Sequence, residues 1–268
     1  MTRIIMNGCN GHMGRVITEL VESDADAQIV AGVDIVAPPM APYPVYSSVA
    51  DVKEEADVII DFSTPKILTK LIEEAQKRNI ALVLCTTGYT KEQIAEIDEA
   101  SKTTAIVRSA NMSLGVNVLL RLVQEAAKKL AAEGFDIEIV EKHHHFKKDA
   151  PSGTALAIAD AINEALPEAL PYVYDRSGRS EPRPKSEIGI SAVRGGTIVG
   201  EHEIMFCGTD EVITLSHMAY SKAIFGKGAV VAAKYVAGKG PGLYTMMDVI
   251  DGPDRGGRQT RTISGGTV

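Results

Sequence analysis

Three glycines that directly follow a short apolar run constrain the fold of this chain most. Residues 3–6 predict a buried strand, and Gly8, Gly11 and Gly14 come next. Apolar residues then recur at helical spacing over 13–22, so the glycines form a turn between a strand and a helix. Such a turn uses glycine where the backbone takes unusual φ values, approaches a phosphate, or brings a helix close to a sheet. The chain is therefore expected to open with a β–turn–α unit of the kind that binds dinucleotides, rather than with a turn shaped by packing alone.

Alternating strands and helices continue beyond this unit. Periodicity predicts strands over 29–34, 58–62, 81–85 and 105–108, with helices over 64–79 and 91–103. This order predicts an α/β fold with a Rossmann-like doubly wound parallel sheet.

The pattern changes after residue 113. Long helices are predicted over 116–132 and 154–165, and a further strand over 135–141. Strands over 188–194, 200–206 and 211–217 then follow one another without helices between them. We expect a second α+β domain with a mixed or antiparallel sheet, followed by a helix over 223–237.

Composition narrows the class of protein. Among 268 residues, 5% are aromatic and none is Trp, so the core is expected to be aliphatic, as in buried parallel sheets. With 28 Lys and Arg against 35 Asp and Glu, the chain is a poor candidate for general nucleic-acid binding. No apolar run reaches the roughly 18 residues of a membrane span. The absence of a leader and the widely spaced Cys9, Cys85 and Cys207 predict a cytoplasmic protein without disulfides.

The acidic residue that ends the second predicted strand bears on the cofactor. Asp34 can accept hydrogen bonds from the ribose hydroxyls of NAD. It would repel the 2′-phosphate of NADP, and the next residue is Ile35 where an arginine would compensate. His12 could supply part of a positive charge. We therefore expect NADH to be favoured, with NADPH possible.

The densest chemistry lies in the run 141–154. His143, His144 and His145 are consecutive, and along an extended chain they alternate between two sides, so no metal site is expected; zinc sites use spaced ligands. A solvated polar loop is the plainer alternative. Histidine titrates near neutrality, lysine can neutralise a carboxylate, and a helix that starts near Ser152 offers free N–H groups to an anion. The run predicts proton transfer to a small anionic substrate.

At these residues the chain resembles the dihydrodipicolinate reductase (4-hydroxy-tetrahydrodipicolinate reductase) family. The pattern E-x-H-H-x-x-K-x-D-A-P-S-G-T-A is met from Glu141 to Ala155. The opening glycines, the segments 61–65, 86–88 and 110–113, and the stretches 194–202 and 242–249 also match, so the resemblance covers about residues 1–251.

The resemblance implies a role for each matching residue. It implies an acid/base role for His143 and a catalytic role for Lys147. It implies that the substrate, a small heterocyclic dicarboxylate, contacts His144, Lys147, Ser152, Gly153 and Thr154. It implies that the cofactor contacts Gly8, Gly11, Met13, Gly14, Asp34, Thr87, Gly88, Ala110, Asn111 and Met112. We add His12, for its possible positive charge, and Thr86, next to Thr87, as further candidate cofactor contacts. Met112 stands where relatives often have an aromatic residue.

The resemblance also implies an organisation and a reaction. Residues 1–113 and 223–251 would bind the dinucleotide, residues 114–222 would bind substrate and form a homotetramer, and 252–268 would be a flexible tail. The reaction would be NAD(P)H-dependent reduction of 4-hydroxy-tetrahydrodipicolinate to tetrahydrodipicolinate with loss of water, in lysine and diaminopimelate biosynthesis. Two alternatives remain: another Rossmann reductase, such as a relative of aspartate dehydrogenase, and a nucleotide-sensing protein without catalysis.

Overall fold

A parallel sheet of seven strands organises the first part of the chain in the computed structural model, which describes residues 1–36 and 41–252. The strands are β1 (Thr2–Asn7), β2 (Ala27–Val33), β3 (Val45–Tyr46), β4 (Val58–Asp61), β5 (Ala81–Leu84), β6 (Ala105–Arg108) and β12 (Gly242–Tyr244). They lie in the order β12-β6-β5-β4-β1-β2-β3, and each neighbouring pair is parallel. The predicted Rossmann-like sheet is confirmed.

Helices cover both faces of this sheet, because its strands are apolar on both sides. Helices α1 (His12–Glu22) and α6 (Ala223–Val236) pack on one face, where Ile4 and Ile60 are fully buried. Helices α2 (Leu68–Arg78) and α3 (Lys91–Ala100) pack on the other, against Ile5 and Ile59. The predicted helix over 64–79 starts with a 3₁₀ turn at Pro65–Ile67 and ends at Asn79, which takes a left-handed conformation.

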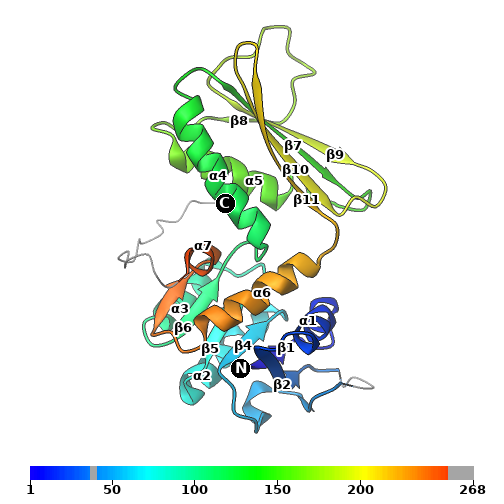
Figure 1. The fold of residues 1–268 in the computed structure, drawn as a ribbon, viewed down its shortest axis with the longest axis vertical. Helices are drawn as coiled ribbons and strands as arrows, with labels where there is room; N and C mark the ends of the chain where they lie inside the picture. Colours follow the sequence, from blue (N-terminus) through cyan, green and yellow to red (C-terminus); the bar gives the residue numbers. More distant parts are fainter. Residues whose placement is uncertain (37–40, 253–268) are drawn as a thin grey trace.

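The second lobe is built on a mixed sheet (Figure 1). Its strands are β7 (Asp136–His143), β8 (Tyr172–Val173), β9 (Ile188–Arg194), β10 (Gly200–Cys207) and β11 (Val212–Ala219), in the order β11-β10-β7-β9-β8. β10 is antiparallel to both of its neighbours, whereas β7 and β8 run parallel to β9. Helices α4 (Leu114–Leu130) and α5 (Gly153–Ala165) cover one face of this sheet. This confirms the expected second domain with a mixed sheet.

The chain passes between the lobes just before α4 and again between β11 and α6 (Figure 1). Where α6 meets the first crossing, a Cβ on Gly228 would lie 1.7 Å from the carbonyl oxygen of Met112. Glycine is therefore required for the close approach of α6 to the chain that leads into α4.

Two short elements near the end of the chain were not predicted. β12 has three residues and adds to the edge of the parallel sheet beside β6, and α7 (Met246–Asp251) follows it. The predicted tail, apart from Gly252, lies outside the described residues.

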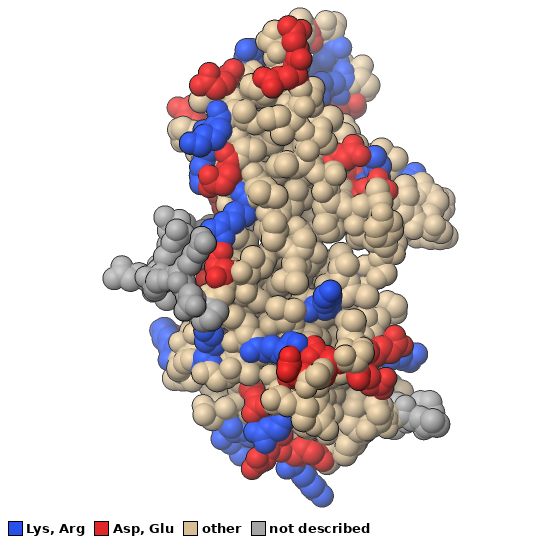
Figure 2. Space-filling view, in the orientation of Figure 1, with Lys and Arg blue, Asp and Glu red and all other residues tan. Residues whose placement is uncertain are grey.

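The described residues contain no helix with the length and apolar character needed to cross a membrane. On the face drawn in Figure 2, Lys and Arg of the described residues are interspersed with Asp and Glu rather than gathered into one basic surface.

Candidate active site

The glycine turn lies between β1 and α1, at the carboxyl edge of the parallel sheet. Gly8 has a φ of +81°, and a Cβ there would lie 2.6 Å from the carbonyl oxygen of Phe62. A Cβ on Gly14 would lie 2.3 Å from the carbonyl oxygen of Gly8. Gly11 precedes the first residue of α1 and no side chain caps this helix, so the N-terminal N–H groups stay available to an anion. The turn therefore fits a dinucleotide pyrophosphate.

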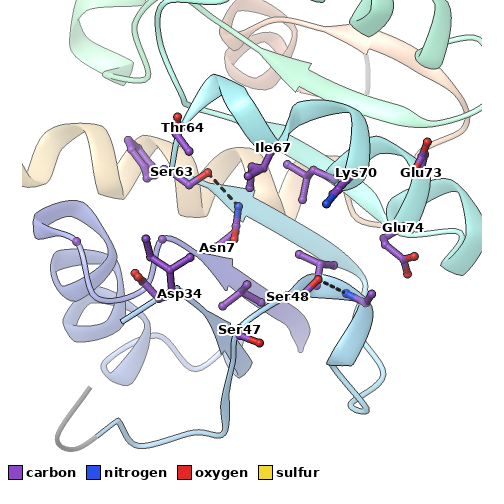
Figure 3. Close-up of a pocket in the computed structure, with 18 residues that line it drawn as sticks. Asn7, Asp34, Ser47, Ser48, Ser63, Thr64, Ile67, Lys70, Glu73 and Glu74 are labelled. Carbon is purple, nitrogen blue, oxygen red and sulfur yellow. Dashed lines mark hydrogen bonds between the residues drawn. The ribbon is translucent and has the colours of Figure 1, made fainter. Parts of the chain in front are cut away.

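The carboxylate of Asp34 is bound to this turn. Its two oxygens accept hydrogen bonds from the backbone N–H groups of Asn10 (3.0 Å) and Val36 (3.2 Å). A cavity of about 670 Å³ opens here, and Gly8, Gly11 and Asp34 are among the residues that line it. Figure 3 shows Asp34 and Ser47 on one side of the cavity and the segment that carries Thr64 and Lys70 across from them. His12 is exposed and Met13 half-buried on the first turn of α1.

A buried carboxylate joins the loops at the sheet edge. Asp61, at the end of β4, accepts hydrogen bonds from Asn7 Nδ2 (2.7 Å), Ser63 Oγ (2.5 Å) and Thr86 Oγ1 (2.6 Å). Burial raises the pKa of this carboxyl, and the hydrogen bonds from Ser63, Thr86 and Asn7 oppose that rise. The loops after β1, β4 and β5 are thus held to one another, which places Thr86 beside the glycine turn.

The other residues predicted to contact the cofactor lie in two loops. Thr87 and Gly88 are exposed after β5, and Ala110 is exposed after β6. Asn111 Nδ2 donates to Thr154 Oγ1 (3.3 Å), so this loop touches the start of α5 in the other lobe. The side chain of Met112 is buried in the core of the first lobe, and its carbonyl oxygen packs against Gly228, so the expected contact of this side chain with the cofactor is not formed by the structure.

The predicted proton-transfer cluster lies at the end of β7, on the face covered by helices. Side chains alternate along a strand, so Glu141 and His143 share this face with buried core residues, whereas Lys142 points to the opposite face. His143 Nδ1 lies 2.6 Å from Glu141 Oε2. The ring of His202, on neighbouring β10, meets the His143 ring edge-on, with 5.2 Å between ring centroids.

Burial and charge act on these groups in opposite directions. Burial lowers the pKa of His143, the hydrogen bond and charge of Glu141 raise it, and nearby Lys147 and Arg194 lower it. Burial alone would raise the pKa of Glu141, but the hydrogen bonds from Arg194, His143 and the Ser152 amide outweigh it and hold this pKa below its usual range. Glu141 is therefore an ionised carboxylate beside a histidine whose pKa burial holds below its ordinary value.

Lys147 lies in the loop that follows β7. Its ammonium is 2.8 Å from both carboxylate oxygens of Asp149, and this pairing lowers the pKa of Asp149. His144 is half-buried at the start of the same loop, and its carbonyl accepts a hydrogen bond from the Lys147 amide (3.1 Å). An incoming substrate carboxylate could replace Asp149 as the partner of Lys147.

Helix α5 begins at Gly153, next to this loop. Ser152 caps the helix: its hydroxyl accepts from the Ala155 amide (3.1 Å) and lies 2.9 Å from His202 Nε2. The side chain of Ser152 is buried and already used, whereas Gly153 is exposed and Thr154 half-buried. An anion would therefore meet the N–H groups of the helix start rather than the Ser152 hydroxyl.

Sequence reasoning assigned no role to three residues that shape the cluster: Glu141, Arg194 and His202. Both terminal guanidinium nitrogens of Arg194 donate hydrogen bonds to the Glu141 carboxylate, at 2.6 and 2.8 Å. Glu141 opens the motif quoted for the His/Lys run, and that position was the available signal. The contacts with Arg194 and His202 depend on strand register, which the sequence does not reveal. In the part of the chain that the structure describes, no group of three or more His, Cys, Asp or Glu is placed to hold a metal ion.

His202 should make folding stability depend on pH. Burial lowers its pKa to about 4, and its Nδ1 has no hydrogen-bond partner within the described residues. The unfolded chain therefore binds an extra proton between pH about 6.5 and about 4, and stability is lost as pH falls through this window. We expect His202→Gln to reduce the loss of unfolding free energy between pH 7 and pH 5 by about 2 kcal/mol, measured by urea titration. Equal losses in both proteins would contradict this assignment.

Comparisons with known proteins agree with this geometry. The family model for the N-terminus of dihydrodipicolinate reductase matches residues 2–112, and the model for its C-terminus matches residues 115–250. A 4-hydroxy-tetrahydrodipicolinate reductase from Caldanaerobacter subterraneus subsp. tengcongensis is 57% identical over 250 residues, which cover 93% of this chain and 98% of the relative. The protein of that name from Aquifex aeolicus is 42% identical over 264 residues, which cover 92% of this chain and 98% of the relative.

A solved structure shares the fold. It is the dipicolinate-bound dihydrodipicolinate reductase from Paenisporosarcina sp. TG-14, with a TM-score of 0.77 and 24% sequence identity. The match covers 91% of this chain and 97% of that chain. Both family models and the relatives span nearly all of the described residues, and the chain belongs to the dihydrodipicolinate reductase family.

Proposed function

We propose that this chain reduces 4-hydroxy-tetrahydrodipicolinate to tetrahydrodipicolinate with NAD(P)H and loss of water, in lysine and diaminopimelate biosynthesis. The observation that carries the proposal is the grouping of His143, Lys147 and the start of α5. Thr154, at that helix start, also contacts Asn111 of the other lobe. That contact brings a loop from the dinucleotide lobe to the proton-transfer cluster. Relatives named for this activity and a dipicolinate-bound member of the family support the choice of a dicarboxylate substrate.

The residues of the chain divide the chemistry between them. When bound, a reduced nicotinamide would supply a hydride to a ring carbon of the substrate from which the hydroxyl has left as water. Hydride addition adds two electrons, and one proton must follow; we assign its delivery to the protonated ring of His143. Lys147, His144 and the N–H groups at Gly153 and Thr154 hold the two carboxylates. Ser152 contributes by capping that helix start.

Turnover with freshly prepared substrate tests this proposal. We expect the chain to oxidise NADH when 4-hydroxy-tetrahydrodipicolinate is added, followed by the loss of nicotinamide absorbance. No oxidation with either reduced cofactor would reject the activity. Oxidation with another keto or imino acid in place of this substrate would favour a different Rossmann reductase, and binding of NADH without any turnover would favour a nucleotide sensor.

The surroundings of the cavity favour NADH over NADPH. Its lining carries the carboxylates of Asp34, Glu73 and Glu74 against the single lysine Lys70 among the described lining residues. Ile35, where an arginine would bind a 2′-phosphate, is 93% exposed and brings no charge. A phosphate added at this end of the cofactor would therefore meet net negative charge.

Exchanging one side chain should change this preference. We expect wild-type kcat/KM to be higher with NADH than with NADPH, and Ile35→Arg to raise kcat/KM for NADPH about tenfold, because a hydrogen bond to a charged group contributes roughly 1.5–3 kcal/mol. Steady-state kinetics with both cofactors measure this. Ile35→Gln serves as a control for side-chain length without charge, and equal gains in both variants would contradict the electrostatic explanation.

The two lobes suggest a division of labour. We assign residues 1–113 and 223–251 to dinucleotide binding and 114–222 to substrate binding and assembly. Exposed apolar side chains on the face of the mixed sheet that the helices leave open (Val193 on β9, Val212 and Met218 on β11) support a homotetramer formed through this sheet. The expected location is the cytoplasm, where this cofactor and substrate are available.

A further inference from the structure

The carboxylate of Glu141 receives four hydrogen bonds, although its side chain is fully buried. Oε1 accepts from the Ser152 amide (2.9 Å) and from Arg194 Nη2 (2.6 Å). Oε2 pairs with His143 Nδ1 (2.6 Å) and accepts from Arg194 Nη1 (2.8 Å). One carboxylate thus connects the end of β7, the end of β9 and the start of α5.

Each of these contacts fixes one part of the candidate site. Arg194 and Ser152 supply only donors to the carboxylate, and an ionised carboxylate is an acceptor only. His143 Nδ1 must therefore carry the proton that it shares with Glu141. That leaves Nε2 of the neutral ring free to accept a proton, and Nε2 has no hydrogen bond within the described residues. The Ser152 contact ties the same carboxylate to the residue that caps α5.

We propose that Glu141 is the positioning residue of this site. It holds His143 in the Nδ1–H tautomer, which leaves Nε2 without a proton, and it fixes the position of that ring relative to the N-terminus of α5. The inference rests on the proposed function, because it assigns Glu141 to the same proton transfer and the same carboxylate-binding helix start. The acid/base group and the anion-binding group then keep a fixed distance from each other, as differential binding of a transition state requires.

The space around His143 supports this arrangement. A Cβ on Gly200 would lie 3.1 Å from His143 Nε2, so glycine at the start of β10 leaves the side of the ring that carries Nε2 uncrowded. His202 packs edge-on against the ring and is itself held by Ser152 Oγ. The imidazole is therefore held from two strands, and among the described residues no hydrogen bond engages its Nε2.

An amide in place of this carboxylate would break the arrangement. Both oxygens of Glu141 face donors, so the NH2 group of a glutamine would meet either Ser152 and Arg194 or His143 and Arg194. In the second orientation the amide donates to Nδ1, and the proton of the neutral ring moves to Nε2. Glu141→Gln is thus nearly isosteric but reverses the hydrogen-bond polarity of the site.

The pH dependence should change in a defined direction. The charged and titratable groups that face His143 are Glu141 on the same strand, Arg194 on β9, His202 on β10 and Lys147 in the following loop. Of these, Glu141 favours the protonated ring. If protonated His143 is the acid, kcat falls as pH rises through its pKa, and loss of the carboxylate moves that fall to lower pH.

The test compares Glu141→Gln with Glu203→Gln in the full chain. Glu203 pairs with Lys142 on the opposite face of the mixed sheet, so it is a matched control. We expect Glu141→Gln to lower kcat about 100-fold or more while KM for NADH stays within about twofold. The fall in kcat should move to lower pH, and nitrogen NMR should show the His143 ring leaving the Nδ1–H tautomer. Glu203→Gln should change none of these.

Several outcomes separate the possibilities. A folded Glu141→Gln with kcat within about threefold of wild type, or with an unchanged His143 tautomer, overturns the inference. If that variant does not fold, Arg194→Gln provides the test. Without Arg194 as its counter-ion, Glu141 should become protonated at a higher pH. If the His143 tautomer and kcat then depend on pH as they do in the wild type, the inference is overturned. If wild type does not turn over the substrate, the proposed function fails, whereas the NMR measurement still tests the role of Glu141.

Discussion

Replacing Lys147 with alanine is expected to lower kcat for the proposed substrate by about a hundredfold to about ten-thousandfold, the range that a positioned proton-transfer or charge-neutralising group supplies. Lys147 lies in the loop between β7 and α5, and its ammonium is held 2.8 Å from both oxygens of Asp149. The variant would leave a substrate carboxylate unpaired in a partly buried site, which also raises KM for the substrate. Steady-state kinetics with saturating NADH measure both effects.

The neighbouring Lys148 provides the control for this experiment. It is exposed, and Lys148→Ala removes the same charge from the same loop. We expect Lys148→Ala to keep kcat within about twofold of wild type. A loss of less than about tenfold in Lys147→Ala, or equal losses in both variants, would refute a specific catalytic role for Lys147.

Gly14→Ala is expected to weaken NADH binding by about tenfold to about a hundredfold. The added Cβ would lie 2.3 Å from the Gly8 carbonyl oxygen and 2.5 Å from that of Cys9. Relief of this overlap must shift the turn or move α1 away from the sheet, and overpacking of this kind costs typically 1–3 kcal/mol. The N–H groups that we propose bind the cofactor phosphates would then leave their positions. Fluorescence titration with NADH measures the change in Kd.

A second glycine in the same lobe controls for general effects of an added methyl group. A Cβ on Gly240 would meet no atom within 4 Å, so Gly240→Ala should leave the Kd for NADH unchanged. Thermal unfolding of both variants separates a distorted turn from a destabilised lobe. Unchanged NADH binding in a folded Gly14→Ala protein would show that the turn does not require a close approach at this position.

Much of the fold could be predicted because the long elements carry strong periodic patterns. The strands over 105–108 and 188–194 coincide with β6 and β9, and the seven-stranded sheet follows from the alternation of strands and helices. β12 was missed because three residues after a Gly-Pro pair are too few to show a period. It becomes a strand because β6 offers a free edge for pairing.

The candidate site was only partly predictable for a related reason. His143, Lys147 and the start of α5 are close in sequence, so a local motif could group them. The cross-strand partners His202 and Arg194 could not be grouped with them, because their placement depends on the register of β10 and β9 against β7. Burial also changes one expectation. The side chain of Met112, which was expected to contact the cofactor, packs in the core of the first lobe instead.

The register of the mixed sheet limits where this sequence can gain or lose residues without loss of the site. Arg194 lies opposite His143 and His202 lies opposite Glu141, so strand pairing sets the spacing of the cluster. Insertions or deletions in the loop between β8 and β9, or in the turn between β10 and β11, leave those pairings intact. A single deleted residue within β9 or β10 would turn every following side chain to the other face. Insertions and deletions among functional descendants of this chain should therefore occur in the loops and not within these strands.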